Sequence, residues 1–99
     1  MNAGKRDGVA VVTGASRGIG AAIAERFASK GMAVACVATS ASNALPMVER
    51  IRADHGVHAL AVGMHVQDRD SVEAGMTLIE AELGPISVLV NNEIGRAHV

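Results

Sequence analysis

The stretch that decides the fold reads Val9-Ala10-Val11-Val12-Thr13-Gly14-Ala15-Ser16-Arg17-Gly18-Ile19-Gly20. Its apolar run is typical of a strand buried on both faces, and three glycines follow at the start of a helix. Gly14 allows a sharp exit from the strand, Gly18 lets the backbone approach a ligand, and Gly20 lets the helix lie flat against the sheet. Because the free N–H groups of such a helix face the turn, the stretch predicts a site for nucleotide phosphates.

The rest of the chain alternates short apolar runs with helical patterns. Besides Val9–Thr13, strands are expected at Ala33–Ala38, Ala59–Gly63 and Ser87–Val90. The apolar residues that indicate the three intervening helices are Ile19, Ile23 and Phe27, then Ala44, Met47, Val48 and Ile51, then Val72, Met76, Ile79 and Leu83.

Polar residues suggest where two of these helices begin. Ser42 or Asn43 is expected to be the N-cap of the second helix, which would place Pro46 in the first turn, where a missing N–H is tolerated. Asp68 or Asp70 is expected to cap the third helix.

The predicted order is β-α-β-α-β-α-β, with no linker or internal repeat. Right-handed crossovers make this a parallel sheet of strand order 3-2-1-4. The fold class is therefore α/β, a three-layer Rossmann-type sheet of half size, with residues 1–99 forming one truncated dinucleotide-binding domain.

Composition limits the partners and the compartment. The chain has 9 basic and 10 acidic residues, which predicts no nucleic-acid partner. No apolar run approaches membrane-spanning length, and the first eight residues do not have the pattern of a secretory signal. Cys36 is the single cysteine, so an intrachain disulfide is excluded. A cytoplasmic protein with no membrane partner is therefore expected.

The run Thr13-Gly14-Ala15-Ser16-Arg17-Gly18-Ile19-Gly20 resembles the short-chain dehydrogenase/reductase family, and most closely its 3-oxoacyl-acyl-carrier-protein reductase branch. The resemblance extends from about Gly8 to Asn92. Three glycines alone would also fit a purely structural turn. A second motif favours the family, because Val88-Leu89-Val90-Asn91-Asn92 matches the start of its Asn-Asn-Ala-Gly sequence.

The end of the second expected strand bears on the choice of cofactor. An acidic residue there would accept the ribose 2′-OH of NAD, but this chain has Thr39 and Ser40 instead. Arg17 would add a cation beside a 2′-phosphate. The resemblance therefore implies NADP(H). The alternative is that Arg17 is a solvated loop charge and Thr39 a simple turn former.

The resemblance extends to two further positions, each next to a departure from the family pattern. Val66 would donate its backbone N–H to the adenine, although His65 replaces the usual Asp or Asn before it. Asn92 would lie near the cofactor ribose, but Glu93 and Ile94 then replace Ala-Gly. The complete set of cofactor-binding residues that the resemblance implies is Gly14, Ser16, Arg17, Gly18, Ile19, Gly20, Thr39, Val66 and Asn92.

No catalytic residue and no metal ligand is assigned. The family uses a Tyr-x3-Lys pair and a Ser that lie beyond the segment represented here, and this chain contains no tyrosine. The four histidines are not clustered with a cysteine in a metal-binding pattern. We expect the NADP(H)-binding half of a reductase, binding its cofactor weakly and inactive alone.

Two other functions and one partner remain open at this stage. The chain could be a free-standing nucleotide-binding or assembly module, or an enzyme whose site the sequence does not reveal. The fourth expected strand and the residue after it, Ser87–Asn91, would form an apolar sheet edge in a half-size fold. A homo-oligomer that buries this edge or a sheet face is expected.

Overall fold

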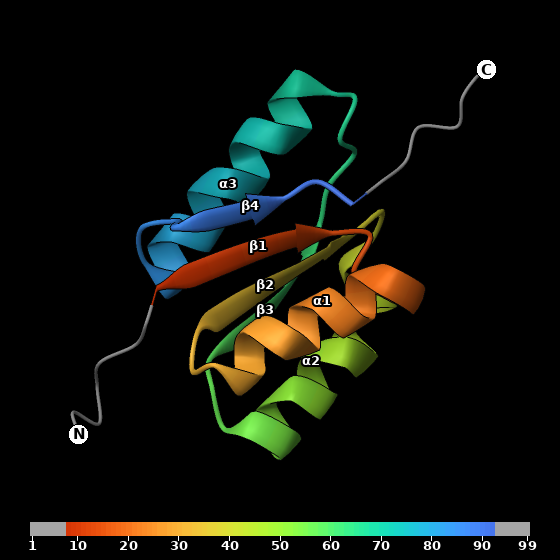
Figure 1. Cartoon of the computed structure of the whole chain (residues 1–99). Coiled ribbons are helices and arrows are strands. Elements are labelled where there is room, and N and C mark those ends of the chain that lie inside the picture. The colour runs from red at the N-terminus through yellow and green to blue at the C-terminus, as the bar shows by residue number, and fades with distance from the viewer. Residues whose placement is uncertain (1–7, 93–99) are drawn as a thin grey trace.

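The computed structural model describes residues 8–92 of the chain (Figure 1). The elements in chain order are β1 (Val9–Thr13), α1 (Gly18–Ser29), β2 (Ala33–Ala38), α2 (Ala41–His55), β3 (Ala59–Gly63), α3 (Arg69–Leu83) and β4 (Val88–Val90). The first three strands match the predicted bounds.

The last strand begins one residue later than predicted. The backbone N–H of Ser87 donates to the carbonyl of Val9 at 2.8 Å. The Ser87 hydroxyl accepts from the N–H of Val9 at 3.3 Å. Because a side chain makes the second contact in place of a carbonyl, the regular ladder begins only at Val88.

The four strands form one parallel sheet in the order β3-β2-β1-β4, as the sequence predicted. Thr13 at the end of β1 is paired with Val37 of β2, so the carboxyl ends of these strands lie side by side. The backbone N–H of Ala15 donates to the Val37 carbonyl at 3.1 Å, which holds the turn after β1 against β2. The β1–α1 and β2–α2 connections therefore meet where the carboxyl ends of these two strands lie.

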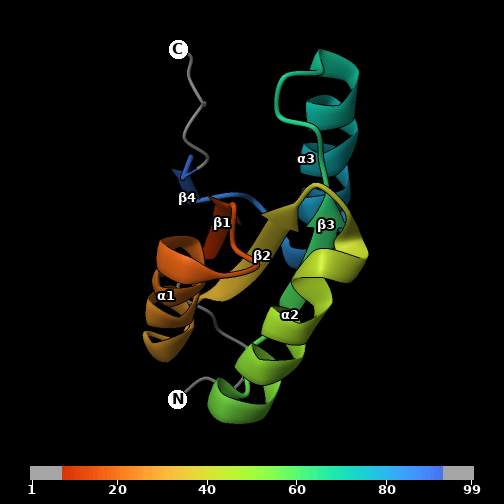
Figure 2. The same cartoon turned by 90° about the vertical axis from the view of Figure 1, so that its right-hand side faces the viewer.

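Helices α1 and α2 cover one face of the sheet and α3 covers the other (Figure 2). The buried residues of α1 are Gly20, Ala24 and Ala28. The bulkier stripe that indicated this helix lies beside that small-residue face, and its first member, Ile19, is 73% exposed. Small side chains let the axis of α1 approach β1 and β2 closely, so the larger residues are displaced to its flank.

The predicted start of α2 was wrong. The helix begins at Ala41 with Ser40 at the N-cap, so Pro46 is the sixth helical residue and lies beyond the first turn. A proline there removes one intrahelical hydrogen bond. Packing compensates for this loss, because Ala44, Met47, Val48 and Ile51 are all buried against the sheet. The earlier start places the first turn of α2 directly after β2.

The N-cap of α3 and the outer strand β4 complete the description of the fold. Asp68 caps α3 as expected, because its carboxylate accepts hydrogen bonds from the backbone N–H of Asp70 at 3.0 Å and of Ser71 at 3.4 Å. β4 is an outer strand of the described sheet, and its Leu89 is 53% exposed. Within residues 8–92, the helices lack the length and apolar character needed to cross a membrane.

Candidate functional site

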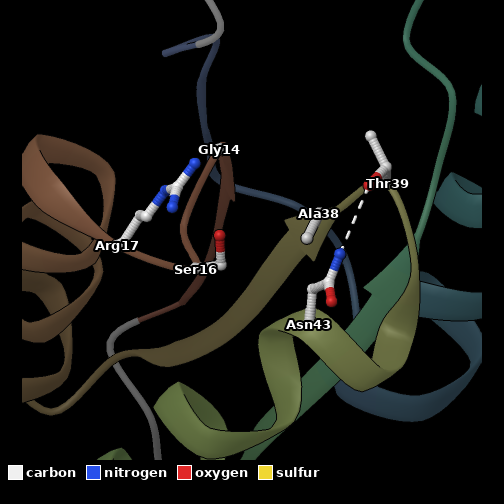
Figure 3. Close-up of a pocket in the computed structure, with 6 residues that line it drawn as sticks. All are labelled: Gly14, Ser16, Arg17, Ala38, Thr39 and Asn43. Atoms are coloured by element: carbon white, nitrogen blue, oxygen red, sulfur yellow. Dashed lines mark hydrogen bonds between the residues drawn. The ribbon is translucent and has the colours of Figure 1, made fainter.

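A pocket of about 420 Å³ opens where the β1–α1 and β2–α2 connections meet (Figure 3). The residues that line it are Gly14, Ser16, Arg17, Ala38, Thr39 and Asn43. The first three come from the glycine-rich turn and the others from the end of β2 and the first turn of α2. The pocket thus lies at the carboxyl ends of two neighbouring parallel strands, where open α/β sheets bind ligands.

The glycine-rich turn is shaped by backbone that other residues adopt with difficulty. Gly18 has a φ of +63°, and a side chain added there would meet nothing within 4 Å, so this backbone is open to a ligand. Gly20 is buried, and a methyl group added there would press on the Gly14 backbone and lie 2.7 Å from Asn92 Nδ2. The turn therefore depends on glycine for conformation at one position and for close packing at the other.

Both helices that begin at the pocket lack a carboxylate at their N-termini. Arg17 is the N-cap of α1 and Ser40 that of α2, and neither side chain makes a capping hydrogen bond. Neither helix has an acidic residue in its first turn. By contrast, α3 has Asp68 at its N-cap and Asp70 in its first turn. Since helix N-termini favour negative charge, the pocket is suited to an anionic ligand.

The pocket includes two residues that the sequence analysis did not assign to a site. Ala38 is the last residue of β2, and Asn43 lies in the first turn of α2. The Asn43 Nδ2 atom donates to Thr39 Oγ1 at 3.4 Å. Asn43 follows Thr39 by four residues, a spacing that brings side chains together at a helical turn. The sequence would have indicated this contact only if α2 had been expected to begin at Ala41.

Val66 belongs to a second, adjoining hollow of about 180 Å³. It is lined by Thr39, Met64, His65, Val66 and Gln67, so Thr39 borders both spaces. The backbone N–H of His65 donates to Ser71 Oγ at 2.8 Å, which holds the loop after β3 to the start of α3. The structure brings Val66 beside the pocket rather than into it.

Asn92 supports the glycine-rich turn. Its Nδ2 atom donates to the Gly14 carbonyl at 3.4 Å, and its backbone N–H donates to Thr13 Oγ1 at 2.8 Å. Asn92 therefore fixes the end of β4 to the end of β1 without lining the pocket. The expectations for Glu93 and Ile94 concern positions outside the described residues.

The side chain of Ile19 lies away from the pocket. It lines an apolar hollow of about 320 Å³ on the outside of α1, together with Ala22, Ile23, Arg26 and Phe27. The sequence motif correctly placed Ile19 in the first turn of the helix. Its side chain, however, points to the flank of α1 because the small residues face the sheet.

No metal centre or reactive thiol adjoins the pocket in the part of the chain that the structure describes. Among these residues, no three His, Cys, Asp or Glu side chains are grouped where they could hold a metal ion. Cys36 is completely buried in the sheet, and this burial raises the pKa of its thiol to about 12.

Comparison with known proteins agrees with this geometry. Residues 8–95 match the short chain dehydrogenase family. The chain is 42% identical over 84 residues to D-threitol dehydrogenase of Mycolicibacterium smegmatis, covering 85% of this chain and 32% of the relative. It is 40% identical over 84 residues to the 3-oxoacyl-[acyl-carrier-protein] reductase of Escherichia coli, covering 85% and 33%.

Solved structures show the same likeness. L-sorbose reductase from Gluconobacter frateurii, solved with NADPH and L-sorbose, has a TM-score of 0.84 and 33% identity over 91% of this chain and 34% of that one. An alcohol dehydrogenase from Thermococcus sibiricus, complexed with 5-hydroxy-NADP, has a TM-score of 0.78 and 34% identity. The match covers 83% of this chain and 35% of the dehydrogenase.

In each of these comparisons the chain spans about a third of the other protein. The part of this chain that matches the family includes the glycine-rich turn, the four-stranded sheet and the pocket between the first two connections. With the family match covering residues 8–95, this chain belongs to the short chain dehydrogenase family.

Proposed function

We propose that this chain binds NADP(H) in the pocket between the β1–α1 and β2–α2 connections, and that it prefers NADP(H) to NAD(H). The observation that carries the proposal is the lining of that pocket, where Arg17 and Thr39 are present and no acidic residue is found among the six lining residues. A carboxylate at the end of β2 would favour a ribose 2′-OH, whereas a cation and a hydroxyl donor favour a 2′-phosphate.

The proposed roles of the site residues follow from their positions. Gly14, Ser16 and Gly18 present backbone and a hydroxyl to the pyrophosphate, and Gly20 permits that turn to form. The start of α1 adds its helix dipole. Val66 borders the adenine from the adjoining hollow. The remaining residues proposed from the motif, Ile19 and Asn92, act through the helix start and the Gly14 carbonyl respectively.

The chain by itself holds the cofactor without catalysing a reaction. When bound, NADP(H) would supply the chemistry of hydride transfer. The residues of this chain bind and orient the phosphates, but no tyrosine is present to move a proton to or from a carbonyl oxygen. The proposed unit is one domain, located in the cytoplasm, that binds its cofactor weakly.

Self-association through β4 completes the proposal. The sheet order leaves β4 with one neighbour, β1, among the described strands. Leu89 adds an apolar side chain that is 53% exposed. An apolar outer strand with unpaired backbone groups is prone to pair with another chain, and a second copy presents the same edge.

Calorimetric titration of the 99-residue protein with NADPH and NADH tests the cofactor proposal. NADPH is expected to bind more tightly, and Arg17→Ala is expected to weaken NADPH by about 1–3 kcal/mol, the range for losing a hydrogen bond to a charged group, while leaving NADH unchanged. Arg26→Ala is the matched control, because Arg26 is on the same helix but lines the apolar hollow. Tighter binding of NADH than of NADPH would contradict the proposal. An equal loss of NADPH affinity in Arg17→Ala and Arg26→Ala would also contradict it.

A further inference from the structure

The contact between Asn43 and Thr39 is the one side-chain hydrogen bond that spans two of the residues lining the pocket (Figure 3). Thr39 Oγ1 accepts this bond from Asn43 Nδ2 at 3.4 Å. Arg17 is on the other connection, at the start of α1, so the pocket lies between a cation and this hydroxyl–amide pair. Thr39 also borders the adjoining hollow.

The direction of this hydrogen bond determines what the Thr39 hydroxyl offers a ligand. A hydroxyl has a single proton, and it can accept and donate at once. Because Thr39 accepts from Asn43, its own proton is directed away from the amide. A phosphate oxygen accepts hydrogen bonds from such a donor, whereas a ribose hydroxyl pairs equally well with a donor or an acceptor.

We propose that Asn43 is a positioning residue that makes Thr39 a hydrogen-bond donor toward the pocket, and so increases selectivity for a ribose 2′-phosphate over a 2′-hydroxyl. The inference rests on the proposed function, because it assigns a specificity residue to that same pocket. Asn43 acts through Thr39, and Arg17 supplies the charge.

Asn43 is well suited to a role that is separate from folding. Its side chain is exposed, and the buried face of α2 is formed by Ala44, Met47, Val48 and Ile51. Ser40 occupies the N-cap, and its hydroxyl pairs with that of Ser42 at 3.1 Å. The Asn43 amide therefore contributes neither to core packing nor to the polar contact between the two serines, and its side chain is hydrogen-bonded to Thr39.

The test compares 2′,5′-ADP with 5′-AMP, because these ligands differ by the 2′-phosphate. Calorimetry on the 99-residue protein gives the ratio of their dissociation constants. Asn43→Ala is expected to lower the preference for 2′,5′-ADP about three- to tenfold, the change that corresponds to one net hydrogen bond. Asn43→Asp is expected to lower it more than tenfold, since the carboxylate accepts the Thr39 proton and repels the phosphate.

Two controls separate positioning from a general structural effect. Ser42→Ala removes the neighbouring hydrogen bond to Ser40 and is expected to leave the preference unchanged. Thr39→Val removes the hydroxyl through which Asn43 acts. In the Thr39→Val background, Asn43→Ala is expected to have no further effect on the ratio, which is the signature of coupled residues in a double-mutant cycle.

The outcomes distinguish this inference from the proposed function. If the unmodified protein shows no preference for 2′,5′-ADP, both fail. If it prefers 2′,5′-ADP but Asn43→Ala and Asn43→Asp keep the original ratio, the role of Asn43 is refuted and the NADP(H) proposal stands. Equal weakening of both ligands would also refute the positioning role, because it would indicate a structural effect of the substitution.

Discussion

Substitution of Gly20 by alanine gives a direct test of how the glycine-rich turn is packed. At an exposed helix position, Gly→Ala stabilises a protein by about 0.5–1 kcal/mol, because alanine restricts the unfolded chain and favours the helix. Gly20 is a helical residue in α1, but its position is buried against the Gly14 backbone. We therefore expect the sign of the effect to be reversed.

The magnitude follows from the atoms that the new methyl group would meet. It would press on the Gly14 carbonyl, and it would lie 2.7 Å from Asn92 Nδ2. The first neighbour is backbone, so relief requires movement of the turn itself. Overpacking of this kind costs about 1–3 kcal/mol. After subtraction of the helical gain, the free energy of unfolding should fall by about 1–2 kcal/mol.

Gly75 provides a matched control within the same chain. It is a buried glycine in α3, where an added methyl group would meet the terminal methyl of Met64. That neighbour is the end of a flexible side chain and can move aside, so Gly75→Ala should be neutral or stabilise by up to about 1 kcal/mol.

Urea unfolding followed by circular dichroism measures both changes. With a slope of about 1 kcal/mol per molar urea for a small domain, Gly20→Ala should lower the midpoint by about 1–2 M. Binding of NADPH should weaken in parallel, because the displaced Gly14 lines the pocket. A Gly20→Ala midpoint equal to or above that of the unmodified protein would refute the packing argument.

Four further predictions concern activity, the buried thiol, for which there are two, and self-association. NADPH absorbance should stay at background when the protein is mixed with β-ketoacyl or simple ketone substrates, and turnover abolished by His65→Ala would contradict this. Cys36 should resist alkylation by iodoacetamide at pH 8 until urea unfolds the chain, because burial raises its thiol pKa to about 12; prompt labelling of folded protein would contradict the structure. Since this folded pKa lies above the ordinary thiol pKa of 9.0, the thiol's contribution to stability should be present below pH 9 and lost as pH rises toward 12. Urea unfolding across this pH range measures the change, which should be absent in Cys36→Ala. Leu89→Lys should reduce the sedimentation coefficient of an oligomer that forms through β4, and an unchanged oligomer would place the interface elsewhere.

The sequence alone was enough to predict the sheet and its connections. Apolar runs marked β1, β2 and β3 at their observed bounds, and the alternation with helices led to the strand order through the handedness of crossovers. These features are local, or follow from a general topological rule. The glycines after β1 likewise predicted a sharp turn at Gly14, which has a positive φ in the structure. The positive φ of Gly18 was not part of that prediction, which assigned Gly18 to close approach of a ligand.

The start of α2 shows where local signals competed. Ser40, Ser42 and Asn43 are all suitable N-cap residues, and the position of Pro46 favoured the later ones. In the structure the N-cap is Ser40, and the helix contains Pro46 while its apolar face is buried against the sheet. That choice brings Asn43 to the pocket, so a site residue was missed because a helix boundary was displaced.

What only the tertiary structure decided is which parts of the motif face the pocket. The family resemblance grouped Ile19 and Asn92 with Arg17 and Thr39 as expected cofactor-binding residues. Packing of α1 through its small residues turns Ile19 outward, and the pairing of β4 with β1 directs Asn92 onto the Gly14 carbonyl. Both outcomes depend on contacts between elements distant in sequence. A linear pattern specifies residue types and spacing, but the direction of each side chain follows from how the helix and strands pack.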